Sequence, residues 1–96
     1  MPFAVGDRLR FRYPDARRFK HRFYTQPPGS GGRLVPRQES SVDLHGIVDV
    51  LEVKWADWQQ SHWVAVRFQQ PDGQQLWTNA SKDGREWMVH ESPGEM

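Results

Sequence analysis

Cysteine is absent from this 96-residue chain. Its absence excludes disulfide bonds, thiolate zinc sites, iron–sulfur ligation and a cysteine nucleophile, because each of these needs a thiol or thiolate. Any redox chemistry that the protein serves must therefore be carried by another chain.

Long hydrophobic runs are missing as well. No apolar stretch approaches the roughly 20 residues that a membrane-spanning helix needs. The opening residues, MPFAVGDR, have neither the basic region nor the apolar region of a signal peptide. We therefore expect a cytoplasmic protein with no membrane partner.

Motifs for catalysis and metal binding are not found either. The sequence has no H-E-x-x-H, no G-x-S-x-G and no phosphate-binding loop, since GSGG is not followed by a lysine. The histidines are far apart in the sequence and include no i, i+4 pair: His21, His45, His62 and His90. We expect a non-enzymatic chain with no cofactor and no metal.

The fold is predicted from short segments in which apolar and polar residues alternate. A chain of 96 residues suits one domain, 1–96. In residues 3–13, Val5, Leu9, Phe11 and Tyr13 alternate with three arginines, which is typical of a half-buried strand after a Gly-Asp turn. Further strands are expected at 45–55, 62–68, 75–80 and 86–91.

The connections between these segments indicate the architecture. Residues 25–41 are rich in proline, glycine and serine and should form a long mobile loop, and 92–96 should fray. Residues 56–62 should form a turn, 71–73 a tight hairpin turn, and 79–86 a single helical turn or tight loop. This order predicts an all-β, five-stranded SH3-like barrel with a long loop between strands 1 and 2. An OB-type barrel fits less well, because 69–75 is too short for its helix.

Three motifs add a family resemblance. VGDRLRF, VDLHGIVDVLEVKWADW and WVAVRF resemble the variable chain of ferredoxin:thioredoxin reductase, whose group of SH3-like barrels also includes a small photosystem I protein and the nitrile hydratase β subunit. The resemblance implies an electron-transport accessory subunit that packs on a redox or metal-containing catalytic chain. It is carried by Val5, Gly6, Asp7, Leu9, Arg10, Asp43, Leu44, Gly46, Trp58, Val64, Val66, Arg67 and Phe68.

Charge is distributed unevenly along the chain. Residues 1–37 hold nine Lys/Arg against two acids, a balance of 9 − 2 = +7, whereas 38–96 hold four against ten, a balance of −6. The stretch RRFKHRFY (17–24) combines cations with aromatic rings and no acid. One face of the protein should therefore attract anionic partners.

Three interpretations of this basic stretch remain open. They are a solvated loop whose aromatic rings tuck onto the barrel, an arm that docks on an acidic protein surface, and an arm that binds nucleic acid by phosphate neutralisation and base stacking. Trp55 and Trp58 flank a turn, so at least one should be exposed and could form a peptide groove, whereas Trp63 and Trp77 should be core or cross-strand residues. The candidate partner-binding residues are Arg8, Arg10, Arg12, Arg17, Arg18, Phe19, Lys20, Arg22, Phe23, Tyr24 and Trp58.

Overall fold

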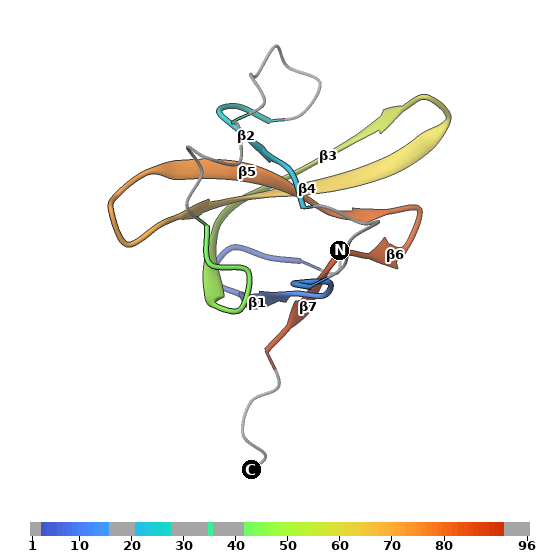
Figure 1. Ribbon diagram of the computed structural model, residues 1–96. Helices are drawn as coiled ribbons and strands as arrows, with labels where there is room; N and C mark the ends of the chain where they lie inside the picture. Colours follow the sequence, from blue (N-terminus) through green and yellow to red (C-terminus); the bar gives the residue numbers. More distant parts are fainter. Residues whose placement is uncertain (1–2, 16–20, 28–34, 36–41, 92–96) are drawn as a thin grey trace.

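The computed structural model describes residues 3–15, 21–27, 35 and 42–91 (Figure 1). These residues form an antiparallel sheet of seven strands and contain no helix. The strands are β1 (Arg8–Phe11), β2 (Phe23–Tyr24), β3 (Ile47–Trp58), β4 (Ser61–Gln69), β5 (Gln75–Lys82), β6 (Arg85–Glu86) and β7 (Met88–His90). The all-β prediction is therefore confirmed, with two short strands, β2 and β6, in addition to the five expected.

The order of the strands is β2-β5-β4-β3-β1-β7, and β6 pairs with β5. β3 and β4 are longer than the sequence suggested, because their hairpin turn is only Gln59 and Gln60, both with positive φ. The turn expected over 56–62 is thus largely strand. The helical turn or tight loop expected over 79–86 is likewise largely strand: β5 continues to Lys82, and only Asp83 and Gly84 make the turn into β6.

One residue connects two distant parts of this sheet. The amide of Trp87 donates to the carbonyl of Ala80 at the end of the sheet that holds β5, and the carbonyl of Trp87 accepts from the amide of Arg12. β7 then pairs with β1 through Leu9 and His90. The C-terminal strand segment therefore passes from β5 to β1 within a few residues.

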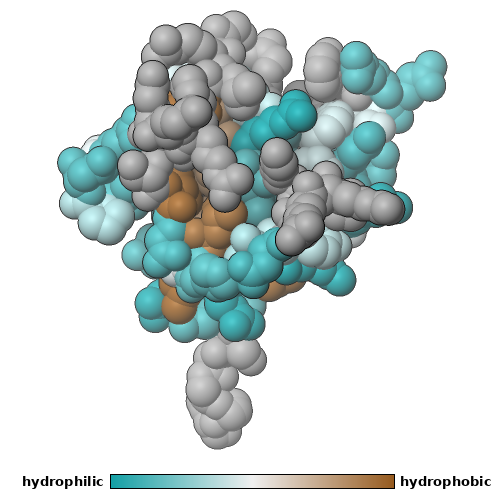
Figure 2. Space-filling model, viewed as in Figure 1, coloured by the Kyte–Doolittle hydropathy of each residue, from teal (hydrophilic) through white to brown (hydrophobic). Residues whose placement is uncertain are grey.

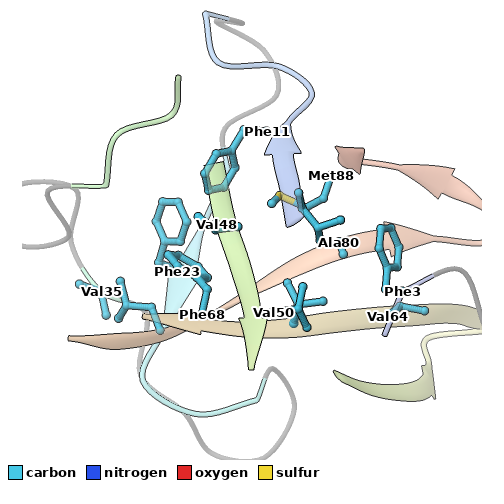
Figure 3. Close-up of a cluster of buried hydrophobic side chains, with 13 residues drawn as sticks. Phe3, Phe11, Phe23, Val35, Val48, Val50, Val64, Phe68, Ala80 and Met88 are labelled. Atoms are coloured by element: carbon cyan, nitrogen blue, oxygen red, sulfur yellow. The ribbon is translucent and has the colours of Figure 1, made fainter. Parts of the chain in front are cut away.

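The core lies on the face of the sheet to which Leu9, Phe11, Val64, Val66 and Phe68 point, as their alternation predicted. Phe11, Phe23 and Phe68 meet edge to face, with ring centroids 5.8 to 6.3 Å apart. Phe23, Phe68 and Val35 lie toward one end of the cluster, and Phe3 and Val64 toward the other (Figure 3). Aromatic contacts of this kind add stability beyond burial alone.

The expected place of Val5 in the first strand is wrong, and Val35 is buried although the loop around it was expected to be mobile. Val5 is 67% exposed, because it lies in the turn from Ala4 to Asp7, where Gly6 has a φ of +94°, and not in β1. The loop expected over 25–41 is anchored at Val35, which is buried in the core and donates its amide to the carbonyl of Phe23 at 2.8 Å. Val35, from a stretch rich in proline, glycine and serine, thus lies beside β2. The rest of that loop, apart from 25–27, and the tail 92–96 lie outside the described residues.

Candidate protein-docking face

The face of β1 turned away from the core carries Arg8, Arg10 and Arg12, all exposed, as the alternation with buried Leu9 and Phe11 predicted. β1 lies between β3 and β7, and two of its residues, Leu9 and Arg10, have a cross-strand neighbour on both sides. Directly opposite residues share a face of the sheet. The register therefore shows which residues lie beside Arg8 and Arg10.

Arg8 is surrounded by negative charge. Its guanidinium lies 3.6 Å from the carboxylate of Asp49 on β3 and 3.2 Å from that of Glu91, which follows β7. Exposed ion pairs such as these contribute little stability, but they neutralise the cation locally. Arg8 is therefore the weakest of the three arginines as a site for an anionic partner.

Arg10 lies between two apolar residues. Its cross-strand neighbours are Ile47 on β3, which is 40% exposed, and half-buried Val89 on β7. No ion pair of Arg10 occurs within the described residues. A cation flanked by exposed aliphatic side chains is a combination found in protein interfaces, where arginine is enriched.

Arg12 marks the end of β1 and lies 5.7 Å from the ring centroid of Tyr13, a cation–π contact. Tyr13 also donates its backbone amide to Nε2 of His21 at 3.4 Å, and the His21 ring meets the ring of Phe11 edge to face at 4.9 Å. Burial lowers the pKa of His21, so this imidazole is neutral and can accept the amide hydrogen. We call Arg10, Arg12, Ile47 and Val89 the basic face.

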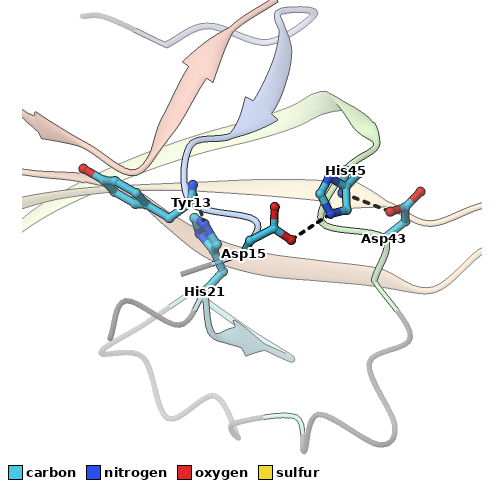
Figure 4. Close-up of polar contacts among 5 residues, drawn as sticks. All are labelled: Tyr13, Asp15, His21, Asp43 and His45. Carbon is cyan, nitrogen blue, oxygen red and sulfur yellow. Dashed lines mark hydrogen bonds and ion pairs between the residues drawn. The ribbon is translucent and has the colours of Figure 1, made fainter. Parts of the chain in front are cut away.

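The described residues on either side of 16–20, Asp15 and His21, are both held by contacts with other parts of the chain. The carboxylate of Asp15 lies 3.1 Å from Nε2 of His45, whose own amide donates to the carboxylate of Asp43 at 2.9 Å (Figure 4). His21, at the other end, packs against Phe11 and Tyr13.

The remaining candidate residues of the stretch differ in their exposure to solvent. Arg22 is exposed, Tyr24 is half-buried and pairs with Trp77 of β5, and Phe23 is only 6% exposed. Phe23 belongs to the core, so we remove it from the candidate contact surface. Its role fits the interpretation in which the aromatic rings tuck onto the sheet. Arg17, Arg18, Phe19 and Lys20 lie outside the described residues, as does the side chain of Trp58.

The other tryptophans divide as expected. Trp55 is 59% exposed on β3, and Trp77 is 5% exposed. Trp63 meets Trp87 edge to face at 5.6 Å and lies 5.0 Å from the ammonium of Lys82, which makes it a cross-strand residue. On the side shown in Figure 2, the described surface is mostly hydrophilic, with hydrophobic residues gathered in one area left of centre.

Three of the four histidines contact an aspartate, and no two histidines are grouped together. His45 contacts Asp15, His62 contacts Asp57, and Nε2 of His90 lies 2.8 Å from the carboxylate of Asp7. The hydrogen bond to His90, followed by that from the Ala4 amide, holds the pKa of Asp7 below its usual value. Among the described residues, no three His, Cys, Asp or Glu side chains are grouped as a metal ion would require, and no helix is long and apolar enough to span a membrane.

Comparison with known proteins gives no further information. No family model, no curated protein and no solved structure matches this chain. The resemblance to the ferredoxin:thioredoxin reductase variable chain therefore depends on the sequence motifs alone.

Three features of the basic face and its surroundings were not predicted from the sequence. Ile47 and Val89 flank Arg10 only because of the strand register, which the sequence does not display, and the Asp15–His45 contact joins residues 30 positions apart. The cation–π contact of Arg12 with Tyr13 was open to prediction, since the two residues are adjacent in the sequence.

Proposed function

We propose that this protein is a non-catalytic docking module that binds an acidic protein surface through its basic face and the adjoining stretch 16–22. The observation that carries the proposal is the position of Arg10: exposed, without an ion pair in the described residues, and flanked by Ile47 and Val89. Arg12 and Arg22 extend the positive charge toward the anchored ends of the stretch. An acidic partner gains charge complementarity from the arginines and apolar burial from their neighbours.

We also propose that the sheet is a five-stranded SH3-like barrel. Without the two-residue strands β2 and β6, the order is β5-β4-β3-β1-β7, which places the last strand beside the first. The two hydrogen bonds of Trp87, one to Ala80 and one from Arg12, support closure between the strands at the two ends. This fold agrees with the proposed accessory role beside a catalytic chain, which the sequence resemblance also suggests.

Nucleic acid remains the competing ligand. Four carboxylates border the basic face or its ends: Asp7, Asp15, Asp49 and Glu91. A long polyanion would pass close to them, whereas a protein surface can present its acids only opposite the arginines. We therefore favour a protein partner.

The test compares two variants with equal loss of charge. Arg10→Gln with Arg12→Gln alters the basic face, and Lys54→Gln with Arg85→Gln removes two exposed cations from β3 and β6. Each should change the free energy of unfolding by less than about 0.5 kcal/mol per substitution. A partner captured from the native host should bind the first variant at least about tenfold more weakly than it binds the unmodified protein, mainly because association is slower. It should bind the control variant with nearly unchanged affinity.

Two outcomes would contradict the proposal. Equal binding by both variants would show that the basic face is not the docking site. Submicromolar binding of random single-stranded or duplex nucleic acid at physiological salt would favour the nucleic-acid interpretation, since we expect nothing tighter than about 10 μM, within the range of non-specific contacts.

A further inference from the structure

The second half of β3 has one edge with no strand beside it. β1 pairs with β3 only from Ile47 to Asp49, and Val50 is the last residue engaged on that side, through Asp7 and Gly6. Beyond Val50, β4 is the only strand neighbour of β3 within the described residues. The β3–β4 hairpin projects away from β1 and β7 at the upper right of Figure 1.

A β-bulge separates the paired part from the open part. The register between β3 and β4 shifts between Val50 and Glu52, and bulges bend a strand and terminate its pairing. Among the residues that the structure describes, the segment from Glu52 to Trp58 is therefore an open edge, which presents amides and carbonyls to another strand.

The turn of the hairpin determines which backbone groups point outward. Gln59 and Gln60 have φ of 51° and 65°, and Trp58 faces Ser61 across this two-residue turn. The residues that flank such a turn bond each other, and bonded and non-bonded pairs then alternate along an antiparallel ladder. The amides and carbonyls of Val53, Trp55 and Asp57 therefore point away from β4, toward the open edge.

We propose that this edge pairs with the same edge of a second copy of the chain, antiparallel about a two-fold axis at Trp55. In this register each segment from Glu52 to Trp58 overlaps the whole of its counterpart. The outward-pointing groups of Val53, Trp55 and Asp57 face those of Asp57, Trp55 and Val53 of the second copy. Two sheets then join into one across the open edges.

Three other registers meet a collision or a charge conflict, and a fourth, centred on Ala56, would shorten the overlap to residues 54–58. Centring on Val53 would put Trp58 of the second copy opposite Val48, where Leu9 already pairs. Centring on Lys54 would oppose two ammonium groups, and centring on Asp57 would oppose two carboxylates and shorten the overlap. The register at Trp55 avoids all three conflicts.

The side chains agree with this choice. Trp55 is 59% exposed, the most exposed aromatic residue among the large hydrophobic side chains of the described surface. On the two-fold axis its ring lies beside its own counterpart, and cross-strand aromatic pairs stabilise sheets. Because the contact is smaller than the roughly 1,200 Å² of stable complexes, we expect a Kd on the order of 0.1–1 mM.

Association is measured first, by sedimentation velocity of the full chain from about 10 μM to 1 mM. The sedimentation coefficient should rise with concentration toward that of a dimer. Val53→Pro removes an outward amide and should abolish the rise, whereas Val53→Thr should keep it. If Val53→Pro does not fold, Trp55→Thr serves instead and should weaken dimerisation at least about tenfold.

The register is tested by cross-linking. Since the chain has no cysteine, Val53→Cys and Asp57→Cys each introduce a single thiol. Residues 53 and 57 of opposite copies should have Cα atoms about 5.5 Å apart, within disulfide range. A mixture of the two variants should therefore cross-link under mild oxidation, and each variant alone should not. A sedimentation coefficient independent of concentration, or equal cross-linking of single variants and mixture, would overturn the proposal.

Discussion

Replacing Phe23 tests whether this aromatic residue of the basic stretch is part of the core or of a binding surface. Its side chain is 6% exposed and meets Phe11 at 5.8 Å and Phe68 at 5.9 Å, both edge to face. Truncation of a buried phenylalanine to alanine costs about 3–5 kcal/mol. Since a chain of this size is stable by about 5–14 kcal/mol, Phe23→Ala could unfold it outright.

Phe23→Leu is therefore the sharper variant. It keeps most of the buried volume and loses the two edge-to-face contacts, each worth about 0.5–1.5 kcal/mol. We expect a loss of about 1–3 kcal/mol, which lowers the Tm by at least about 5 °C in a domain of this size. Urea and thermal unfolding followed by tryptophan fluorescence measure both quantities.

The neighbouring exposed arginine provides the control. Arg22→Gln should change the free energy of unfolding by less than about 0.5 kcal/mol, because its side chain is exposed. An unchanged Tm for Phe23→Leu, together with a loss of partner affinity, would refute the core assignment and return Phe23 to the contact surface.

Two further predictions concern pH and the β3–β4 turn. Burial lowers the pKa of His21. The stability that neutral His21 contributes is therefore complete above the ordinary histidine pKa of about 6.5. It is lost as the pH falls below that value, because the unfolded chain then takes up the proton more readily than the folded chain. His21→Gln, which keeps an acceptor for the Tyr13 amide, should lessen the fall in Tm between about pH 7 and pH 5; an equal fall in both proteins would contradict this reasoning. Gln59→Asn with Gln60→Gly should stabilise the protein by about 1 kcal/mol in urea unfolding, because both positions have positive φ, which glutamine adopts at a cost. No gain would mean that the turn is not left-handed at both residues.

Local alternation was enough to predict the long strands. Val64, Val66 and Phe68 are buried in β4 and Trp63 and Arg67 are partly exposed, as the alternation predicted, although Ala65 is buried as well. By contrast, β2 consists of only Phe23 and Tyr24, too few residues to show a period. Val35 lies in a segment rich in turn-forming residues with no apolar period, so the sequence does not reveal that it is buried beside Phe23.

The sequence predicted which side chains of the candidate site point away from the core. It did not predict which residues of the neighbouring strands lie beside them. The exposure of Arg8, Arg10 and Arg12 followed from the alternation in β1. Neutralisation of Arg8 by Asp49 and Glu91 depends on which strands flank β1 and in which register. That arrangement is set by contacts between residues far apart in the chain, which single-sequence patterns do not encode.

The place of β1 between β3 and β7 also affects when this protein can fold during its synthesis. Leu9 pairs with Val48 on one side and with His90 on the other, 81 positions later (90 − 9). At about 5–20 residues per second, a ribosome needs roughly 4–16 s to make that interval. Until then one edge of β1 has no strand beside it, and open edges invite association with other chains. Pairings between such distant residues also slow folding itself, so the nascent chain spends seconds in a form that molecular chaperones would be expected to protect.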